Sequence, residues 1–426
     1  MNPTGTNEKN GAFGMSIDPE HLDGQQYDVL SPAHIQDPFP LYAQLREEHP
    51  IYWDRKYSFW LLTRYADVKT ALQAPTRFSS ATGTELERRA DKFPARTRKN
   101  FDIAYRILFK SLVASDAPRH TRDRQAVMKA FTPRVITEMR EAISQRVERL
   151  LDLAEQSGTF DFVKQFAYPL PSLVIFDLLG VPQEFHHIFR DASSAVLKFS
   201  PTVFRNDLAK LEQIAESISR ADSVMASLIF QRRTAPQRDL ISLLVHELDG
   251  ALSDEEIGVL CNLLVVAGHE TTANLLGGSL RFLLQKRELW EQLREQPELI
   301  GNAVEELVRF VSPVLWISRI PSEDIELQGH VLQKGSRVLL GIGSANHDPL
   351  EFSDPETLDV GRSKAHSLAF GHGPHYCIGA ALAKMEAEIA LSALLRRMPH
   401  IQLATETFEY EPTYAVRSLK ALPVSI

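Results

Sequence analysis

The sequence FGHGPHYCIG, at residues 370–379, is the most informative stretch of this chain, and the apolar run AALA follows it at 380–383. Its glycines and proline predict an irregular, tightly turned backbone before Cys377. The alanine-rich run predicts a helix that begins just after it. A cysteine at such a junction lies near the positive end of a helix and among backbone N–H groups, which lower the pKa of its thiol. We therefore expect a thiolate at Cys377, with Gly379 leaving room for a large, flat group to approach the backbone.

Three other interpretations of this stretch compete with a functional thiolate. The spacing of Gly371, Gly373 and Tyr376 fails the dinucleotide-binding fingerprint, because the third position is not small and no strand–loop–helix unit surrounds it. A transition-metal site is a second interpretation, although no second cluster supplies a fourth ligand. Its three ligands would be His372, His375 and Cys377. The third interpretation is a buried, inert cysteine.

The pattern Phe370-x-x-Gly373-x-x-x-Cys377-x-Gly379 resembles the haem-binding signature of the cytochromes P450. In that family the cysteine thiolate is the axial ligand of the haem iron, and its electron donation favours cleavage of the O–O bond. The resemblance implies that Cys377 is the iron ligand of haem b (iron protoporphyrin IX), with O2 as the co-substrate.

Upstream of this stretch, residues 253–285 predict a long and mostly buried helix. The helix opens with the capping box SDEE, in which Ser253 is the N-cap and Glu256 the N3 residue. Apolar residues follow at helical spacing. Within them the sequence AGHETT, at 267–272, contradicts both helix propensity and the preference of cores for apolar side chains. Such contradictions are expected at functional sites.

The segment AGHETT has three possible interpretations. It fails the metalloprotease motif His-Glu-x-x-His, because the fifth position is Ala273. A polar patch satisfied by neighbouring groups remains an alternative. The segment also resembles the acid–alcohol pair of the cytochromes P450, with Glu270 and Thr271 in those places as the catalytic residues. The resemblance implies proton delivery to bound dioxygen through Thr271 and ordered water, relayed by Glu270.

A carboxylate and a guanidinium, Glu306 and Arg309, lie at positions i and i+3 of a predicted helix. Alone this is a weak signal, because surface pairs of this kind are common and contribute little. Its place before NHDP, at 346–349, resembles the Glu-x-x-Arg helix and meander of the same family. The pair is structural there, so we leave both residues out of the catalytic set. His347 stands where many relatives carry arginine, which leaves the third partner of this network unidentified.

A haem carries two propionates, which need cationic or hydrogen-bonding partners when they are buried. Candidates lie in the sequence DAPRHTRDR, at 116–124, where Pro118 opens a helix. A charged, solvated helix start is the alternative interpretation of these residues. In the context of the family, four positions match the propionate partners: His120, Arg124, Arg319 and His375.

The composition is typical of a globular protein. The chain has 426 residues, of which 44% are hydrophobic and 24% charged, and this length is enough to bury a large core. A net charge of −8 argues mildly against non-specific binding to nucleic acid or anionic membranes. Two cysteines cannot form a disulfide framework, and no stretch reaches the roughly 18 apolar residues of a spanning helix. We expect a cytoplasmic protein.

The fold class that we expect is mainly α with a small β-rich lobe. No repeat or low-complexity linker marks a domain boundary. We expect a flexible polar tail at 1–27 and a single large cytochrome P450-like catalytic domain at 28–426. Helical patterns lie at 41–48, from 65 onwards, and at 134–156, 183–196, 207–231 and 253–285. Strand signals lie at 51–53, 59–63, 325–327, 331–332 and 338–340.

Residues 79–116 are basic and show little clean periodicity. Their basic side chains include Arg88, Arg89, Lys92, Arg96, Arg98 and Lys99. A basic run is usually a solvated face, and a mobile loop over a binding site is the alternative. By resemblance, the substrate pocket combines this segment with 263–270, 314–318 and 413–416. An apolar cavity, narrowed by Trp316, is indicated by Leu315, Trp316, Ile317 and Val416.

The resemblance runs from about residue 37 to the C-terminus and implies mono-oxygenation of an apolar small molecule. One oxygen atom enters the substrate and the other leaves as water. No flavin or nicotinamide motif is found, so electrons are expected from a separate protein, by resemblance a ferredoxin or flavodoxin with its reductase. The expected docking charges are Arg122, Lys129, Arg134 and Lys384. Two alternatives remain, namely a peroxygenase of the same fold, and a haem-binding sensor or carrier without turnover.

Overall fold

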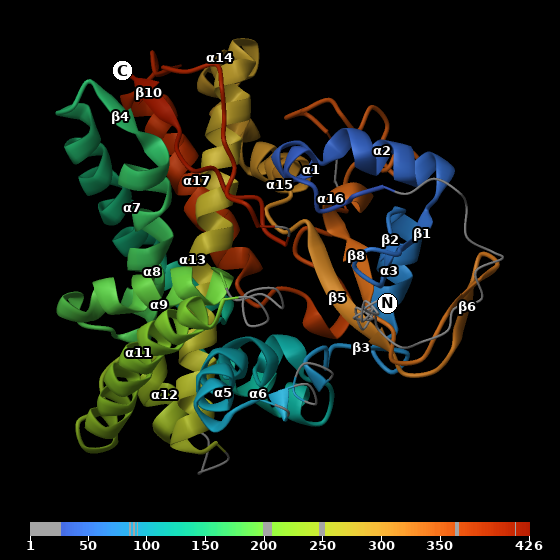
Figure 1. Cartoon of the computed structure of the whole chain (residues 1–426). Coiled ribbons are helices and arrows are strands. Elements are labelled where there is room, and N and C mark those ends of the chain that lie inside the picture. Colours follow the sequence, from blue (N-terminus) through green and yellow to red (C-terminus); the bar gives the residue numbers. More distant parts are fainter. Residues whose placement is uncertain are drawn as a thin grey trace, which may run out of the picture.

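The computed structural model describes residues 27–84, 87, 90–91, 93–198, 207–246, 252–362, 366–413 and 415–426. Most of these residues are helical, and most of the strands gather in a smaller lobe beside the helices, whereas β4 Thr159–Asp161 and β10 Pro423–Ser425 lie outside that lobe, among the helices (Figure 1). The predicted fold class, mainly α with a small β-rich lobe, is confirmed. Except for Tyr27, the tail predicted at 1–27 lies outside the described residues.

The helices agree closely with the periodicity of the sequence. The first group is α1 Pro32–Gln36, α2 Phe39–Glu48, α3 Tyr65–Gln73, α5 Ala95–Phe109, η2 Leu112–Ala114, α6 Arg119–Met128, α7 Pro133–Glu155, η3 Val163–Ala167, α8 Pro169–Leu179, η4 Gln183–Phe185, α9 His186–Lys198, α11 Leu208–Thr234 and α12 Leu240–His246. The second group is α13 Asp254–Gln285, α14 Arg287–Glu295, η5 Pro297–Leu299, α15 Ile300–Val311, α16 Ile342–Ala345, η6 Gly373–His375 and α17 Ala380–Arg397. Each predicted helix is confirmed, with ends displaced by a few residues.

The basic segment 79–116 has the predicted solvated basic face, with Arg96 and Lys99 exposed, but it also has a packed helix that the sequence did not predict. Much of it is the helix α5, whose residues Phe101, Ala104 and Ile107 are buried. Two basic residues of α5 make ion pairs, Arg96 with Glu212 and Arg98 with Asp91 and Asp102. The segment is therefore an amphipathic helix, and its apolar residues are hard to recognise in the sequence because so many charged residues lie between them. The predicted basic residues Arg88, Arg89 and Lys92 lie outside the described residues.

The helix α13 runs through the middle of the helical region, with α17 and α7 to one side (Figure 1). Its N-terminus is fixed by the predicted capping box, because Ser253 accepts from the N–H of Glu256 and Glu256 accepts from the N–H of Ser253. Among the described residues, α13 alone is long and apolar enough to cross a membrane, and 78% of its apolar window is buried inside the molecule. It is a core helix.

Strands form three small sheets. The largest has the order β1-β2-β8-β5-β3, with β2 and β8 parallel and the other neighbours antiparallel. Its strands are β1 Ile51–Asp54, β2 Phe59–Leu62, β3 Phe78–Ser79, β5 Trp316–Pro321 and β8 Val338–Gly341. A second sheet joins β4 Thr159–Asp161, β10 Pro423–Ser425 and β9 Gln402–Leu403, and a hairpin joins β6 Ile325–Leu327 to β7 His330–Leu332. The predicted strands are confirmed.

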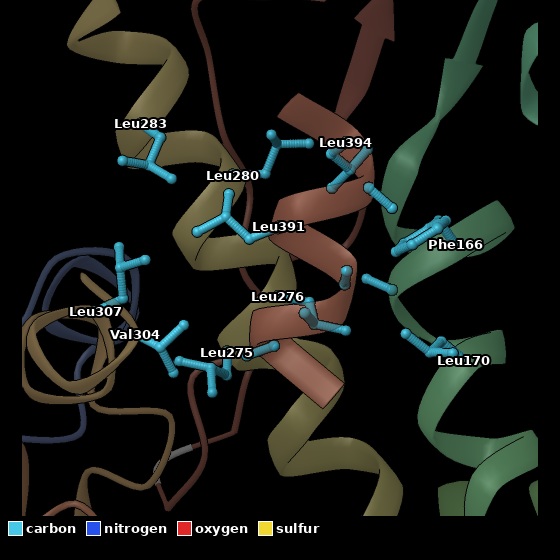
Figure 2. Packing of buried hydrophobic residues seen from close by; sticks show 14 of the residues in the cluster. Phe166, Leu170, Leu275, Leu276, Leu280, Leu283, Val304, Leu307, Leu391 and Leu394 are labelled. Carbon is cyan, nitrogen blue, oxygen red and sulfur yellow. The ribbon is translucent and has the colours of Figure 1, made fainter. Parts of the chain in front are cut away.

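The largest apolar core holds α13 against its neighbours. Figure 2 shows leucines of α13 between Val304 and Leu307 of α15 on one side and Leu391 and Leu394 of α17 on the other. Phe166 and Leu170, from η3 and α8, close the same cluster. Because α17 begins just after Cys377, this packing fixes the position of the cysteine loop relative to the middle of α13.

Candidate active site

The loop before Cys377 has the tight turns that its sequence predicts. Gly371 and Gly373 have φ values of +71° and +69°. At Gly373 an added Cβ would lie 2.6 Å from the backbone oxygen of Leu72, at the end of α3. The loop closes with a hydrogen bond of 2.8 Å from the N–H of Cys377 to the carbonyl of Phe370. Glycine is therefore required at 373 both by its conformation and by the close approach of α3.

Cys377 is accessible to solvent, although protein surrounds its thiol on most sides. This burial raises the pKa of the thiol, and it outweighs the backbone N–H groups of Gly379 and Ala380 and the charge of Arg124, which lower it. The prediction of a lowered pKa is therefore wrong for the thiol without a bound cation. Binding of a metal ion reverses the direction, because a coordinating thiol loses its proton.

The backbone next to Cys377 is open to a flat group. An added Cβ at Gly379 would meet only one ring carbon of Phe131, at 4.0 Å. The predicted room at Gly379 is therefore present. The alternative metal site at this loop is not supported, because His372, His375 and Cys377 do not form a metal-binding group within the described part of the chain.

The middle of α13 has one accessible face in an otherwise buried helix. Ala267 is exposed and Thr271, one turn later, is half-buried, whereas residues 259–266 are all buried. The Thr271 hydroxyl donates to the carbonyl oxygen of Ala267 at 2.9 Å. Gly268 allows close packing of α8, because an added Cβ would lie 3.3 Å from the side chain of Ile175. Ala267, Gly268 and Thr271 are the accessible residues of this turn.

Glu270 lies on another face of α13, in contact with α8. Its carboxylate accepts a hydrogen bond of 3.1 Å from the hydroxyl of Tyr168 and lies 3.5 Å from Nε2 of His269. The prediction from sequence missed both partners. His269 lies within AGHETT, in a helix that the sequence predicts to be buried. A histidine in such a place needs hydrogen-bond partners, and this could have indicated a polar neighbour. No feature of the sequence near Tyr168 indicated its role.

The four predicted propionate partners come together beside the cysteine loop. The rings of His120 and His375 lie 3.9 Å apart, and Arg319 acts electrostatically on both. Arg124 donates to the carbonyl oxygen of Tyr376, next to Cys377, at 2.7 Å. Residues from α6, β5 and η6 thus converge although they are far apart in the sequence.

The electrostatics of this basic cluster fit a dianionic ligand. Burial, with the nearby His120 and Arg319, lowers the pKa of His375 to about 3, and burial lowers the pKa of Arg319 to about 10. The buried Nε2 of His120 has no hydrogen-bond partner among the described residues. Buried cations and an unsatisfied nitrogen are stabilised by carboxylates. The cluster therefore fits the two propionates of a haem whose iron lies at Cys377.

Two residues support the cluster without having been predicted. Asp116 attracts the charge of Arg319 and accepts a hydrogen bond of 2.9 Å from the N–H of Ser80. The hydroxyl of Ser80 lies 3.0 Å from Nε2 of His375. The segment around β3 therefore holds the ring of His375 from the side of the β-rich lobe.

The predicted pair of Glu306 and Arg309 is fully buried on α15, with both N–H···O contacts at 2.7 and 2.8 Å. Its third partner is Arg362, whose Nε donates to Glu306 at 3.1 Å. His347 instead contacts the carbonyl oxygen of Phe310 and the carboxylate of Glu356. The third partner that the sequence left unidentified is therefore Arg362, from later in the meander than His347.

Trp316 does not narrow a substrate pocket. It is 6% exposed and packs edge to face on Tyr42 of α2, with ring centroids 4.9 Å apart. Leu315 belongs to the same core. Side chains alternate along β5, so the burial of Trp316 turns Ile317 to the other face. The predicted neighbourhood of 314–318 and 413–416 is present, since Val314 and Val416 form a β-bridge.

The basic residues predicted to dock an electron donor already have partners within the chain. Arg122 binds Asp123 and Glu256, Arg134 binds Glu138, and Lys384 donates to Glu305. Lys129 also has an interaction of its own. A docking protein must therefore compete with these carboxylates for the charges.

Known proteins resemble the chain over nearly its whole length. The sequence model of the family described as "Cytochrome P450" matches residues 37–407. The polyketide biosynthesis cytochrome P450 PksS of Bacillus subtilis (strain 168) is 38% identical over 403 residues, which cover 92% of this chain and 96% of that protein. The vitamin D(3) 25-hydroxylase of Pseudonocardia autotrophica is 34% identical over 413 residues, covering 94% and 97%.

A solved structure gives the same result. P450BioI, in complex with an acyl carrier protein ligated to hexadec-9Z-enoic acid, has a TM-score of 0.84 and 34% identity, covering 93% of this chain and 100% of its own. A mainly helical fold with a cysteine loop beside a basic cluster, and with a partly accessible turn in its central helix, is that of the haem-thiolate monooxygenases. The chain belongs to the cytochrome P450 family. It is an oxidoreductase, and membership implies haem, oxygen and a redox partner.

Proposed function

We propose that this chain is a haem b monooxygenase in which the thiolate of Cys377 would bind the iron. The observation that carries the proposal is the accessible thiol of Cys377 beside the basic cluster, on a loop whose following helix α17 packs against α13. Cys377 would bind the iron, and four residues would hold the propionates: His120, Arg124, Arg319 and His375. We assign the catalytic domain to 28–426.

The bound haem supplies an iron that binds and activates O2. The residues of α13 supply the protons. In the proposed mechanism the hydroxyl of Thr271 orients water and donates a hydrogen bond at the open face, for which it must leave the carbonyl of Ala267. Glu270 holds a proton at its carboxylate and passes it on through water. Because the neighbouring residues of α13 are buried, little other water reaches the path of the proton from Glu270 to Thr271.

The substrate that this arrangement favours is an apolar small molecule. Two features support this: Ala267 is a small, exposed residue of α13, and the aliphatic residues Val314 and Val416 form a β-bridge. Electrons are proposed to come from a ferredoxin or flavodoxin, each with its reductase, in the cytoplasm. One solved relative is in complex with an acyl carrier protein, so a carrier-bound acyl chain is one form in which such a substrate would be tested.

The first test is the absorption spectrum of dithionite-reduced protein under carbon monoxide. A strongly red-shifted Soret band in the wild type, lost in Cys377→Ala, is the expected result, because only thiolate ligation produces it. The control is Cys261→Ala, since Cys261 is fully buried in the core of α13 and should leave the band unchanged. A wild type without haem, or a band that survives in Cys377→Ala, contradicts the proposal.

A second test separates the oxygenase from a peroxygenase of the same fold. Thr271→Ala removes the hydroxyl that we propose to orient water, and the coupling of NADH oxidation to product should fall at least tenfold. Full retention of coupling, together with faster turnover driven by hydrogen peroxide, favours the peroxygenase. A sensor or carrier without turnover would oxidise no NADH with any ligand, even when a reductase pair is supplied.

A further inference from the structure

Three side chains form a hydrogen-bonded chain where α13 meets α8. The ring of His269 is fully buried, with Nδ1 2.6 Å from the carbonyl oxygen of Val265 and Nε2 3.0 Å from the hydroxyl oxygen of Tyr168. The same hydroxyl lies 3.1 Å from Oε1 of Glu270. The rings of Tyr168 and His269 meet edge to face, with centroids 5.0 Å apart. Tyr168 therefore contacts both of the groups that can take up a proton.

Counting hydrogens restricts the states of this chain. A carbonyl oxygen only accepts, so Nδ1 of His269 carries a hydrogen. Tyr168 has a single hydroxyl hydrogen for two neighbours. If it donates to Glu270, its oxygen accepts from Nε2–H, and His269 is an imidazolium beside a carboxylate. If it donates to Nε2, His269 is neutral and Glu270 must itself be protonated to complete the chain.

These two states contain the same protons and differ only in where one of them resides. In passing from the first to the second, the N–H bond at Nε2 breaks as an O–H bond forms on Tyr168. The former hydroxyl proton of Tyr168 moves to Oε1 of Glu270 in the same step. No electron pair leaves the three residues, and the result is a proton transferred from His269 to Glu270.

We propose that His269, acting through Tyr168, stores the proton that reloads Glu270 during turnover. Mono-oxygenation consumes two protons for each O2, and Glu270 holds only one. His269 has no exposed surface, so its proton enters and leaves through Tyr168, whereas the side chain of Glu270 is 11% exposed and is reloaded from water between turnovers. His269 and Tyr168 are positioning residues. This inference rests on the function proposed above for Glu270.

The electrostatic surroundings favour keeping the middle hydroxyl protonated. Burial and the carboxylate of Glu270 raise the pKa of Tyr168 well above its usual range. Two further charged groups act on the hydroxyl from α9, Arg190 and Asp191, and they oppose one another. Tyr168 thus stays a neutral phenol, because it gains a proton from one neighbour as it gives its own to the other.

The test is the protonation state of His269 in the ferrous carbon monoxide form of the holoenzyme. We would measure it by ¹⁵N NMR between pH 5 and 9, with histidine labelled selectively and His269→Gln used for assignment. In the wild type the ¹⁵N shifts of His269 should show hydrogens on both Nδ1 and Nε2 near neutral pH, which is the imidazolium that the proposal requires. Tyr168→Phe keeps the ring contact but removes the acceptor of Nε2–H, and the ring of His269 should then carry a hydrogen on Nδ1 alone at the same pH.

The matched control is Tyr57→Phe, which removes a hydroxyl that donates to the carboxylate of Asp28 at 3.2 Å, far along the chain from α13. It should leave the titration of His269 unchanged. Coupling of NADH oxidation to product should fall with rising pH in Tyr168→Phe and not in Tyr57→Phe. An unchanged titration of His269 in Tyr168→Phe overturns the proposal.

The two proposals fail in different ways. If the carbon monoxide spectrum shows thiolate ligation while Tyr168→Phe leaves His269 unaffected, only the stored proton is wrong. If Cys377→Ala leaves the spectrum unchanged, the proposed function is wrong, and any shift of the His269 titration then describes a structural network.

Discussion

At the scale of single residues, the cysteine loop depends on a glycine at a position where any side chain would clash. Gly373 combines a left-handed backbone with a close approach to the carbonyl of Leu72. Gly329 has a similar φ of +81°, but nothing lies within 4 Å of its missing Cβ. Replacing each of these two glycines therefore distinguishes the effect of backbone strain, which both positions share, from the effect of a clash with α3, which occurs only at Gly373.

Gly373→Ala should therefore abolish or strongly reduce haem binding. The new Cβ would force the loop away from α3, and Cys377 lies only four residues further on. Gly329→Ala carries a comparable left-handed strain of about 1–2 kcal/mol but should bind haem like the wild type. The haem-to-protein ratio of both purified variants measures this. Equal haem content in the two would show that the approach of α3 does not position Cys377.

At the scale of elements, α13 carries both the core and the chemistry. One side of the helix packs through leucines against α15 and α17 (Figure 2). On another side, Gly268 of α13 packs against α8, and Glu270 accepts a hydrogen bond from Tyr168 at the start of α8. On a third side, Ala267 and Thr271 are accessible. A rigid, well-packed helix thus holds groups for proton transfer at fixed distances.

Leu280→Ala should lower the free energy of unfolding by about 2–5 kcal/mol, because it opens a cavity in this packed core. Leu280 is 2% exposed and lies among the residues of Figure 2. The control is Leu153→Ala on α7, where the side chain is 59% exposed and the loss should stay within about 0.5 kcal/mol. Urea unfolding gives both values. Similar losses would mean that the core around α13 tolerates a cavity.

At the scale of the whole molecule, the helical part and the β-rich lobe meet at a cluster of positive charge. His120 comes from α6, Arg319 from β5 and His375 from the cysteine loop. The packing that brings them together lowers the pKa of His375 to about 3. An unfolded histidine has a pKa near 6.5. The unfolded chain therefore binds one more proton than the folded chain between about pH 6.5 and 3.

It follows that His375 destabilises the haem-free protein as the pH falls through this window, with a slope of up to about 1.4 kcal/mol per pH unit for one proton. Above pH 6.5 its contribution is constant. His375→Asn removes the titrating group and should flatten the decline in the free energy of unfolding between pH 7 and pH 4. Urea unfolding of both proteins across this range is the measurement. An identical slope in the variant would place the proton uptake elsewhere.

The sequence by itself determined the features that short spacing encodes. The glycines before Cys377, the capping box of α13 and the pair of Glu306 and Arg309 are local, because backbone turns and helix faces follow from neighbouring residues. The same is true of most helix boundaries. Local patterns also located the four basic residues, although their convergence was taken from the family.

Tertiary structure alone decided the remaining features. Tyr168 contacts Glu270 across 102 residues of sequence, and Arg362 is the third partner of the pair of Glu306 and Arg309, which the sequence left unidentified. Packing buries Trp316 in a hydrophobic core. It also raises the pKa of the Cys377 thiol, although the backbone N–H groups at the start of the next helix lower it. Burial and hydrogen-bond partners depend on which distant elements come into contact, and local sequence patterns do not contain that information.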